Sequence, residues 1–485
     1  MEIESDGKRR SRYNYTAAVL LRDEIGAVDE CVERFNMVLD DDPGMLKAFQ
    51  AVDTLLTKNK DWKALERAYR KMLKRLPAEG NEPLKVTLWS NLAEIYRSRL
   101  QNYKSAVAAY EVASKLEPDN VDRHIMMAEL YERLMEGNPI EYVDQAVKEH
   151  QVLIAHEPFR YDSYHALFNI YFNANQVDKA YCVASVLSFL KKATPQEEAY
   201  VQEHKKADFV MARQRLSEDT LRRNVFHPDQ DLYLTGILGL IAPAVAAWRA
   251  VDLPATLNPN EVIDVSIDPS LFSRMAKYIK DVLNVAQPDV YLRPNDPGDL
   301  TLMNIKKAGA IHPSIVVFQN LLRGKTESHL SFALGRYLMD LYLPHFCYVA
   351  LDRSPQNLKQ VFLACLRAVG MPVQGDTTAL DQIAREITGR MAPAALDQLR
   401  SLIQKFIDAG GSTDVKRWAA AAELTSYRVG LLLCHDLRIA GQMISQEQSM
   451  LGSAMGPRDK IKELVLYSIS EDYFTARRAI GVQVN

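Results

Sequence analysis

Apolar positions in the first two hundred residues recur at helical spacing and stop at regularly placed prolines. The segments VERFNMVLDDDP, ERAYRKMLKRLP, AAYEVASKLEP and VKEHQVLIAHEP end alike, at Pro43, Pro77, Pro118 and Pro158. The intervals between these prolines are 34, 41 and 40 residues, and each of the two longer intervals holds a polar insertion. A period of this length predicts stacked pairs of helices.

Within each predicted pair, small residues stand where two helices would approach closely. In the second helix of a pair, an aromatic or histidine ring stands between two small or apolar residues at helical spacing. In the first helix, a small residue directly follows an apolar one. The members of this pattern are Ala106, Tyr110 and Ala113; Ala146, His150 and Leu153; Leu92 and Ala93; and Met127 and Ala128. The pattern resembles the tetratricopeptide repeat, in which antiparallel helix pairs pack through small residues and stack on one another. An unrelated helical bundle is the alternative, because other solenoid families have similar periods.

This resemblance implies an α-solenoid of about five helix pairs over residues 13–215, after a flexible N-terminus of residues 1–12. It also implies a concave groove, formed by the first helix of each pair, that binds a protein or peptide partner. The predicted groove residues are Glu94, Arg97, Glu129, Arg133 and Asn169. Any one of them can equally be an ordinary solvated helix residue. Glu94 and Glu129 would repel an anionic ligand, which disfavours the capture of a C-terminal carboxylate.

A stretch without charge follows, LYLTGILGLIAPAVAAW, from Leu232 to Trp248. Its length approaches the ~20 residues that a membrane-spanning helix needs. Asp231 and Arg249 bracket it and Pro243 divides it, so we expect a buried helix or helix-turn-helix, with membrane insertion as the alternative. The next residues contain several prolines and indicate a linker. Residues 216–268 are therefore predicted to join two domains.

The order of elements changes in residues 269–485. A predicted helix, SLFSRMAKYIKDVL, precedes three strand-like runs, DVYLRP, LTLMNI and SIVVFQNLL, and then comes the amphipathic helix ESHLSFALGRYLMDLYLPHF. Strands followed by further helices predict a smaller α+β domain, in a chain that is mainly α overall.

The element order and the sequence FALGR resemble the HExxH gluzincin metallopeptidases, in particular the prenyl-protein and stress-related membrane peptidases. In those enzymes two histidines of one helix bind zinc, the glutamate between them activates water, and a later ExxAD helix supplies the third ligand. The resemblance places Phe332 and Arg336 at the histidine positions and Ala333 at the general base. It places Glu423 at the third ligand and Tyr427 at the aspartate of the ExxAD motif.

The resemblance therefore implies a degenerate site without metal or other cofactor, because one carboxylate cannot hold zinc and no base is left. We expect Arg336 to pair with Glu423 in the former pocket, and the alternative is an Arg336 that points to solvent. A rival hypothesis is an active metal-dependent hydrolase or peptidase whose site is formed by His329, Glu423 and His435. On one helix, however, Glu423 and His435 would lie about 18 Å apart.

Composition narrows the possible functions. The chain has 59 basic and 62 acidic residues, so it offers no basic surface for a nucleic acid. The five cysteines, Cys31, Cys182, Cys347, Cys365 and Cys434, form no pairing motif, and the charged start lacks the apolar segment of a secretory signal. Both observations favour the cytoplasm. The segment LLRGKT ends like a phosphate-binding loop, but Gln319 stands where such a loop needs its first glycine, so we do not expect nucleotide binding.

From these observations the sequence predicts a non-enzymatic scaffold for protein interaction or assembly. The repeat array would recruit a protein partner, and the inactive peptidase-like domain would serve as a binding module.

Overall fold

The computed structural model describes residues 6–25, 27–137, 140–254, 257–258, 261–373, 377–447 and 455–484. The chain divides into two compact units, residues 1–175 and 176–485. Residues 1–5 of the predicted flexible N-terminus lie outside the described residues. The rest of that segment is mostly helical: α1 begins at Gly7, where the Asp6 carboxylate accepts a hydrogen bond from the Lys8 backbone N–H.

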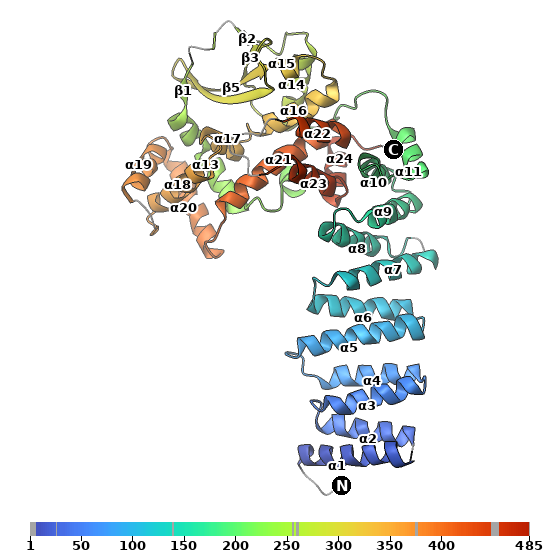
Figure 1. The fold of residues 1–485 in the computed structure, drawn as a ribbon. Helices are drawn as coiled ribbons and strands as arrows, with labels where there is room; N and C mark the ends of the chain where they lie inside the picture. Colours follow the sequence, from blue (N-terminus) through green and yellow to red (C-terminus); the bar gives the residue numbers. More distant parts are fainter. Residues whose placement is uncertain are drawn as a thin grey trace. The chain divides into compact units, whose positions relative to one another are not determined.

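The first unit is a stack of helices joined by short turns (Figure 1). Its four second helices each end two residues before Pro43, Pro77, Pro118 or Pro158, because a residue that precedes proline is disfavoured in the helical conformation. The predicted helical repeat is thus confirmed. In chain order the elements are α1 (Gly7–Leu20), the π-helical turn η1 (Leu21–Ile25), α2 (Val28–Asp41), α3 (Leu46–Lys58), α4 (Trp62–Arg75), α5 (Glu82–Glu94), η2 (Ile95–Arg99), α6 (Tyr103–Leu116), α7 (Val121–Gly137), α8 (Val143–His156) and α9 (Tyr161–Asn173).

The small residues of the repeat pattern are buried between these helices, as predicted; they are Ala93, Ala106, Ala113, Ala128 and Ala146. The rings of the second helices are buried too, and those of α4, α6 and α8 each bond a carboxylate of the preceding first helix. The Tyr69 hydroxyl lies 2.9 Å from Asp53 Oδ1, and the Tyr110 hydroxyl lies 3.3 Å from Glu94 Oε2. In the next pair His150 Nε2 lies 2.8 Å from Glu132 Oε1. These ring–acid pairs satisfy polar atoms that close packing removes from water.

The prolines that end the second helices also anchor the helices that follow. His124 Nε2 lies 2.9 Å from the Pro118 carbonyl oxygen, and the Tyr164 hydroxyl donates to the Pro158 carbonyl oxygen at 3.0 Å. Both rings come six residues after their proline, so this contact recurs with the repeat. The contact gives a hydrogen-bond donor to a proline carbonyl that follows the end of a helix and has no partner within that helix.

Helices α10 and α11, which the sequence assigns to the repeat array, belong to the second unit. There Asp178 of α10 pairs with Arg477 of α24, with 2.7 Å between Oδ1 and Nη2. Arg477 is only 1% exposed, so its charge requires this partner. Asp178 also accepts a hydrogen bond from the Val484 backbone N–H at 2.9 Å. Repeat spacing gives no information about a partner so distant in sequence.

A mixed five-stranded sheet in the order β1-β4-β5-β3-β2 lies in the second unit (Figure 1). The three predicted strand runs are present as β3, β4 and β5, but the last part of the third run forms the short helix α15. The predicted linker adds two short edge strands. The strands are β1 (Val251–Asp252), β2 (Val262–Ile263), β3 (Asp289–Arg293), β4 (Leu300–Lys307) and β5 (Ala310–Phe318); β1–β4 and β3–β5 are parallel, and β2–β3 and β4–β5 are antiparallel.

The uncharged stretch forms one continuous helix, α13, which runs through Pro243 without a break. It is long and apolar enough to span a membrane by length and composition, but half of it is buried inside the second unit. Its side chains pack in one core with those of α17, α18, α19, α20 and α21, and the Trp418 indole N–H donates to the Thr235 hydroxyl at 2.8 Å. The absence of charge in this stretch therefore matches its place in a protein core.

The helices of the second unit are α10 (Val177–Phe189), α11 (Pro195–His204), α12 (Glu218–Thr220), η3 (Leu221–Val225), α13 (Leu232–Arg249), α14 (Leu271–Leu283), α15 (Gln319–Leu322), α16 (Glu327–Met339), α17 (Leu343–Ala350), α18 (Pro355–Ala368), α19 (Thr377–Thr388), α20 (Pro393–Asp408), α21 (Val415–Cys434), α22 (Leu437–Gln446), α23 (Pro457–Ser468) and α24 (Glu471–Ile480).

Candidate functional site between helices α16 and α21

The helix that carries FALGR, α16, packs tightly against α21, the helix with the predicted third-ligand position. Two glycines permit the close approach. A Cβ atom on Gly430 would lie 2.8 Å from the Phe332 carbonyl oxygen, and one on Gly335 would lie 3.0 Å from Leu433 Cδ1. A larger residue at position 430 would therefore force the two backbones apart, whereas one at position 335 would require at least that the Leu433 side chain shift.

The predicted site residues of the two helices meet at this contact. Phe332 and Ala333 are buried on α16, and Tyr427 is fully buried on α21. The Phe332 and Tyr427 rings have their centroids 6.3 Å apart, and the Arg336 guanidinium lies 4.5 Å from the Tyr427 ring centre. Phe332 and Arg336 are four residues apart on one helix face, which brings both side chains to the same neighbour.

Arg336 pairs with a carboxylate that the sequence did not indicate. Its guanidinium donates to Glu447, the C-cap residue that directly follows α22. The predicted partner, Glu423, forms an ion pair with Lys460 of α23 instead, with 2.8 Å between Lys460 Nζ and Glu423 Oε1. Arg336 is thus buried and paired, as predicted, but its predicted partner Glu423 is wrong: the partner is Glu447.

Tyr427 and Lys460 join the two ion pairs into one cluster. The Tyr427 hydroxyl lies 2.5 Å from Glu447 Oε2, and Lys460 Nζ lies 3.0 Å from the Tyr427 hydroxyl. Lys460 Nζ also approaches Glu447 Oε2 at 3.9 Å. We call these five residues, Arg336, Glu423, Tyr427, Glu447 and Lys460, the charge cluster.

The charge cluster contains two cations and two carboxylates, so its net charge is zero. Burial raises the pKa of Tyr427 above its ordinary value, with the nearby Glu447 acting in the same direction, so the phenol stays protonated and can donate a hydrogen bond. Burial alone would lower the pKa of Arg336, but Tyr337, Tyr427 and Glu447 outweigh it and raise that pKa. The guanidinium therefore remains charged.

The residues present do not fit a zinc ion. The two histidine positions hold a phenyl ring and a guanidinium, neither of which is a metal ligand in proteins. Among the described residues, no group of three His, Cys, Asp or Glu side chains gathers closely enough to hold a metal. His329 bonds the Thr326 hydroxyl at 2.8 Å, and His435 bonds the Val210 carbonyl oxygen at 2.8 Å. His329, Glu423 and His435, the residues of the rival hydrolase site, thus each bond a different neighbour and do not gather into one site.

The five predicted groove residues lie on or next to first helices of the array. Glu94 and Arg97 pair with each other, with 2.9 Å between Oε2 and Nε, so each already has a partner. Arg133 lies over the Tyr103 ring and donates to its hydroxyl at 2.8 Å. Glu129 and Asn169 are exposed to solvent, on α7 and α9.

No protein-family model matches this chain. No curated protein matches it either. Among solved structures it is similar to MamA protein, with 14% identity over 42% of this chain and 99% of that chain, at a TM-score of 0.25. It is also similar to TTC0263, a thermophilic TPR protein in Thermus thermophilus, with 16% identity over 40% of this chain and 96% of that chain, at a TM-score of 0.19. A third similar structure is Naa15/Naa10 bound to HypK-THB, with 11% identity over 96% of this chain and 55% of that chain, at a TM-score of 0.25. These scores are too low to support an argument, so the tetratricopeptide-type repeat rests on the helix pairs, buried small residues and prolines described above.

We expect the substitution Gly430→Ala to lower the free energy of unfolding by about 1–3 kcal/mol, because the new methyl group would overlap the Phe332 backbone. Gly137→Ala is the control: it also replaces a glycine in a helix, but a Cβ there meets nothing within 4 Å. It should be neutral or stabilising by up to about 1 kcal/mol. Urea denaturation of both variants measures the difference, and an equal effect would show that the helices do not depend on this contact.

Arg336→Ala should cost about 3–5 kcal/mol of stability, because it removes a buried guanidinium that pairs with Glu447 and leaves this largely buried carboxylate with only the Tyr427 hydroxyl and the more distant Lys460. Adding Glu447→Ala should recover about 0.5–3 kcal/mol of that loss. The exposed pair Arg400 and Asp397, 2.8 Å apart, provides a control cycle with a coupling energy below about 1 kcal/mol. Strictly additive losses at Arg336 and Glu447 in chemical denaturation would contradict the ion pair.

Proposed function

We propose that this protein is a non-enzymatic scaffold for protein interaction or assembly. The repeat array recruits a protein or peptide partner, and residues 269–485 form a peptidase-like domain that has lost its chemistry and acts as a binding module. The free, buried state of all five cysteines supports a reducing location, which we propose to be the cytoplasm.

The charge cluster is the observation that supports this proposal most. In a zinc peptidase the positions of Phe332, Arg336 and Glu423 would surround a divalent cation. Here Arg336 and Lys460 bring two positive charges to Glu423 and Glu447. Side chains thus supply the charge that a zinc ion would carry, and the two helices stay docked without it. At the position of the general base, the methyl group of Ala333 cannot accept a proton.

The repeat array supports the other half of the proposal. Solenoids of helix pairs present an extended surface in which each pair adds a similar face, and such surfaces bind extended peptides or helices. Exposed side chains such as Glu129 and Asn169 remain available to a partner, whereas Glu94 and Arg97 are engaged with each other.

The peptidase-like origin can be tested by restoring the motif. Phe332→His, Ala333→Glu and Arg336→His together rebuild HELGH, and Lys460→Met releases Glu423 from its ion pair. We expect the fourfold variant to bind one zinc ion per chain, as measured by metal analysis after dialysis, because two histidines and one glutamate complete a three-ligand set. The same variant with Glu423→Ala should lose most of this zinc.

A folded fourfold variant that takes up no zinc would contradict the peptidase-like origin. Stoichiometric zinc in the unmodified protein that disappears on Glu423→Ala would contradict the non-enzymatic scaffold itself. Thermal melts with and without zinc, recorded on the same samples, separate a failed fold from a failed metal site.

The groove can be tested with charge variants of the full chain. Glu129→Arg with Asn169→Arg should abolish the capture of partner proteins from an extract of the source cells, because two new cations change the proposed binding face. Gln145→Arg is the matched control, since it adds a cation at an exposed position on the second helix α8. Affinity capture with mass spectrometry compares the three proteins. Unchanged capture by the double variant would contradict binding through the first helices.

A further inference from the structure

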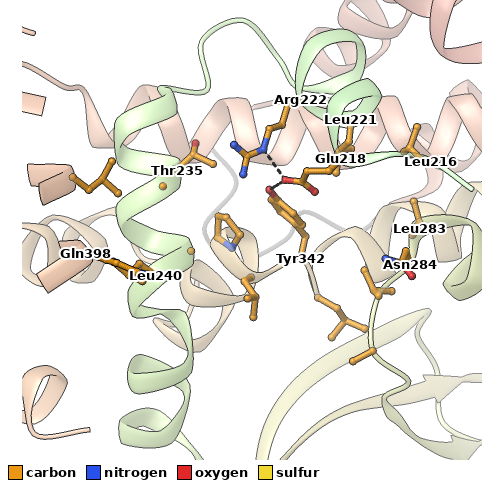
Figure 2. A pocket seen from close by; sticks show the side chains of 18 of the residues that line it. Leu216, Glu218, Leu221, Arg222, Thr235, Leu240, Leu283, Asn284, Tyr342 and Gln398 are labelled. Atoms are coloured by element: carbon orange, nitrogen blue, oxygen red, sulfur yellow. Dashed lines mark hydrogen bonds and ion pairs between the residues drawn. The ribbon is translucent and has the colours of Figure 1, made fainter. Parts of the chain in front are cut away.

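A cavity of about 820 Å³ opens in the second unit, between α13 and the turn that follows α14 (Figure 2). Its volume lies within the roughly 300–1,000 Å³ usual for small-molecule sites. Ten of its twenty lining residues are Leu, Val, Ala or Pro, and Tyr342 is the single aromatic ring among the twenty. The wall therefore suits a flexible alkyl chain better than a planar ring, which would need aromatic surfaces to stack on.

Three charged side chains line the cavity: Glu218, Arg222 and Lys405. Glu218 Oε1 accepts hydrogen bonds from Arg222 Nε at 2.6 Å and from the Tyr342 hydroxyl at 2.7 Å, so its charge is compensated. Lys405 is exposed on α20 and forms no ion pair with the described residues. The lining thus has one positive charge in excess, which favours an anion.

Arg222 retains donors for such an anion. Its bond to Glu218 uses Nε, and Figure 2 shows the terminal amino groups turned away from the Glu218 carboxylate, toward the helix that carries Thr235. A guanidinium donates in a planar fork that matches the two oxygens of a carboxylate.

We propose that this cavity binds one long-chain aliphatic carboxylate, with the alkyl chain against the leucines and the carboxylate at Arg222 and Lys405. The apolar wall removes the chain from water, and the excess positive charge selects an anionic head over a neutral or cationic one. None of the charge cluster residues lines the cavity, and none of the groove residues does. The inference is therefore independent of the proposed scaffold function.

The test is a calorimetric titration of the full chain with sodium oleate below its micelle concentration. One oleate should bind per chain. Lys405→Glu and Leu343→Asp should each weaken binding about tenfold to a hundredfold, because each places a negative charge beside the ligand. Leu343 lines the cavity and is 52% exposed, so both variants change exposed side chains and should fold normally.

The controls are Lys359→Glu and Leu232→Asp, which make the same changes at exposed positions outside the cavity. Both should bind oleate as the unmodified protein does, and methyl oleate, which lacks the charge, should bind at least tenfold more weakly to all. Absence of saturable oleate binding, equal binding of methyl oleate, or equal affinity in all variants would overturn the proposal. So would binding to phosphatidylglycerol vesicles without binding of free oleate. Circular dichroism melts verify the fold of each variant, and one that has unfolded is replaced by Ser401→Glu.

Discussion

The approach of Gly430 to the backbone of Phe332 determines the distance between α16 and α21, and the charge cluster depends on that distance. Arg336 extends from one helix and Tyr427 from the other, and a guanidinium stacks on a ring only within about 6 Å of its centre. Wider separation of the helices would also admit water to the ion pairs, which would weaken them. Because Gly430 has no side chain, α16 and α21 lie close enough for Arg336 to reach the Tyr427 ring and for the ion pairs of the charge cluster to stay out of water.

The cluster also shows how two buried cations, Arg336 and Lys460, can be held beside two partly buried carboxylates. Each charge alone would lose several kcal/mol of hydration on burial. Here every cation has a carboxylate, and the Tyr427 hydroxyl connects both sides by hydrogen bonds to Glu447 and from Lys460. Residues from α16, α21, α22 and α23 must all be in place before the charges balance. This requirement favours one arrangement of the four helices over looser alternatives.

Features that repeat or alternate locally could be predicted from the sequence. The helix ends before Pro43 and Pro118, the buried alanines and the strand runs all follow from spacing along a short segment. The motif resemblance led to the prediction that α16 and α21 meet at Phe332, Arg336 and Tyr427, which do lie together, but the partner that it gave Arg336, Glu423, is wrong. Glu447 and Lys460 were missed because they come from separate elements, and no motif connects them with the residues that they neutralise.

The ion pair between Asp178 and Arg477 has a consequence for the order of folding during synthesis. In the first unit, the rings of α4, α6 and α8 meet their acids across 16 to 18 residues of chain, as Tyr110 meets Glu94 across 16. Asp178 meets Arg477 only across 299 residues. The ribosome therefore delivers every repeat together with its neighbours, whereas α10 must wait until nearly all of the second unit has been made. During that interval Asp178 of α10 lacks its charged partner, and the surface of α10 that packs in the finished unit stays exposed to wrong contacts.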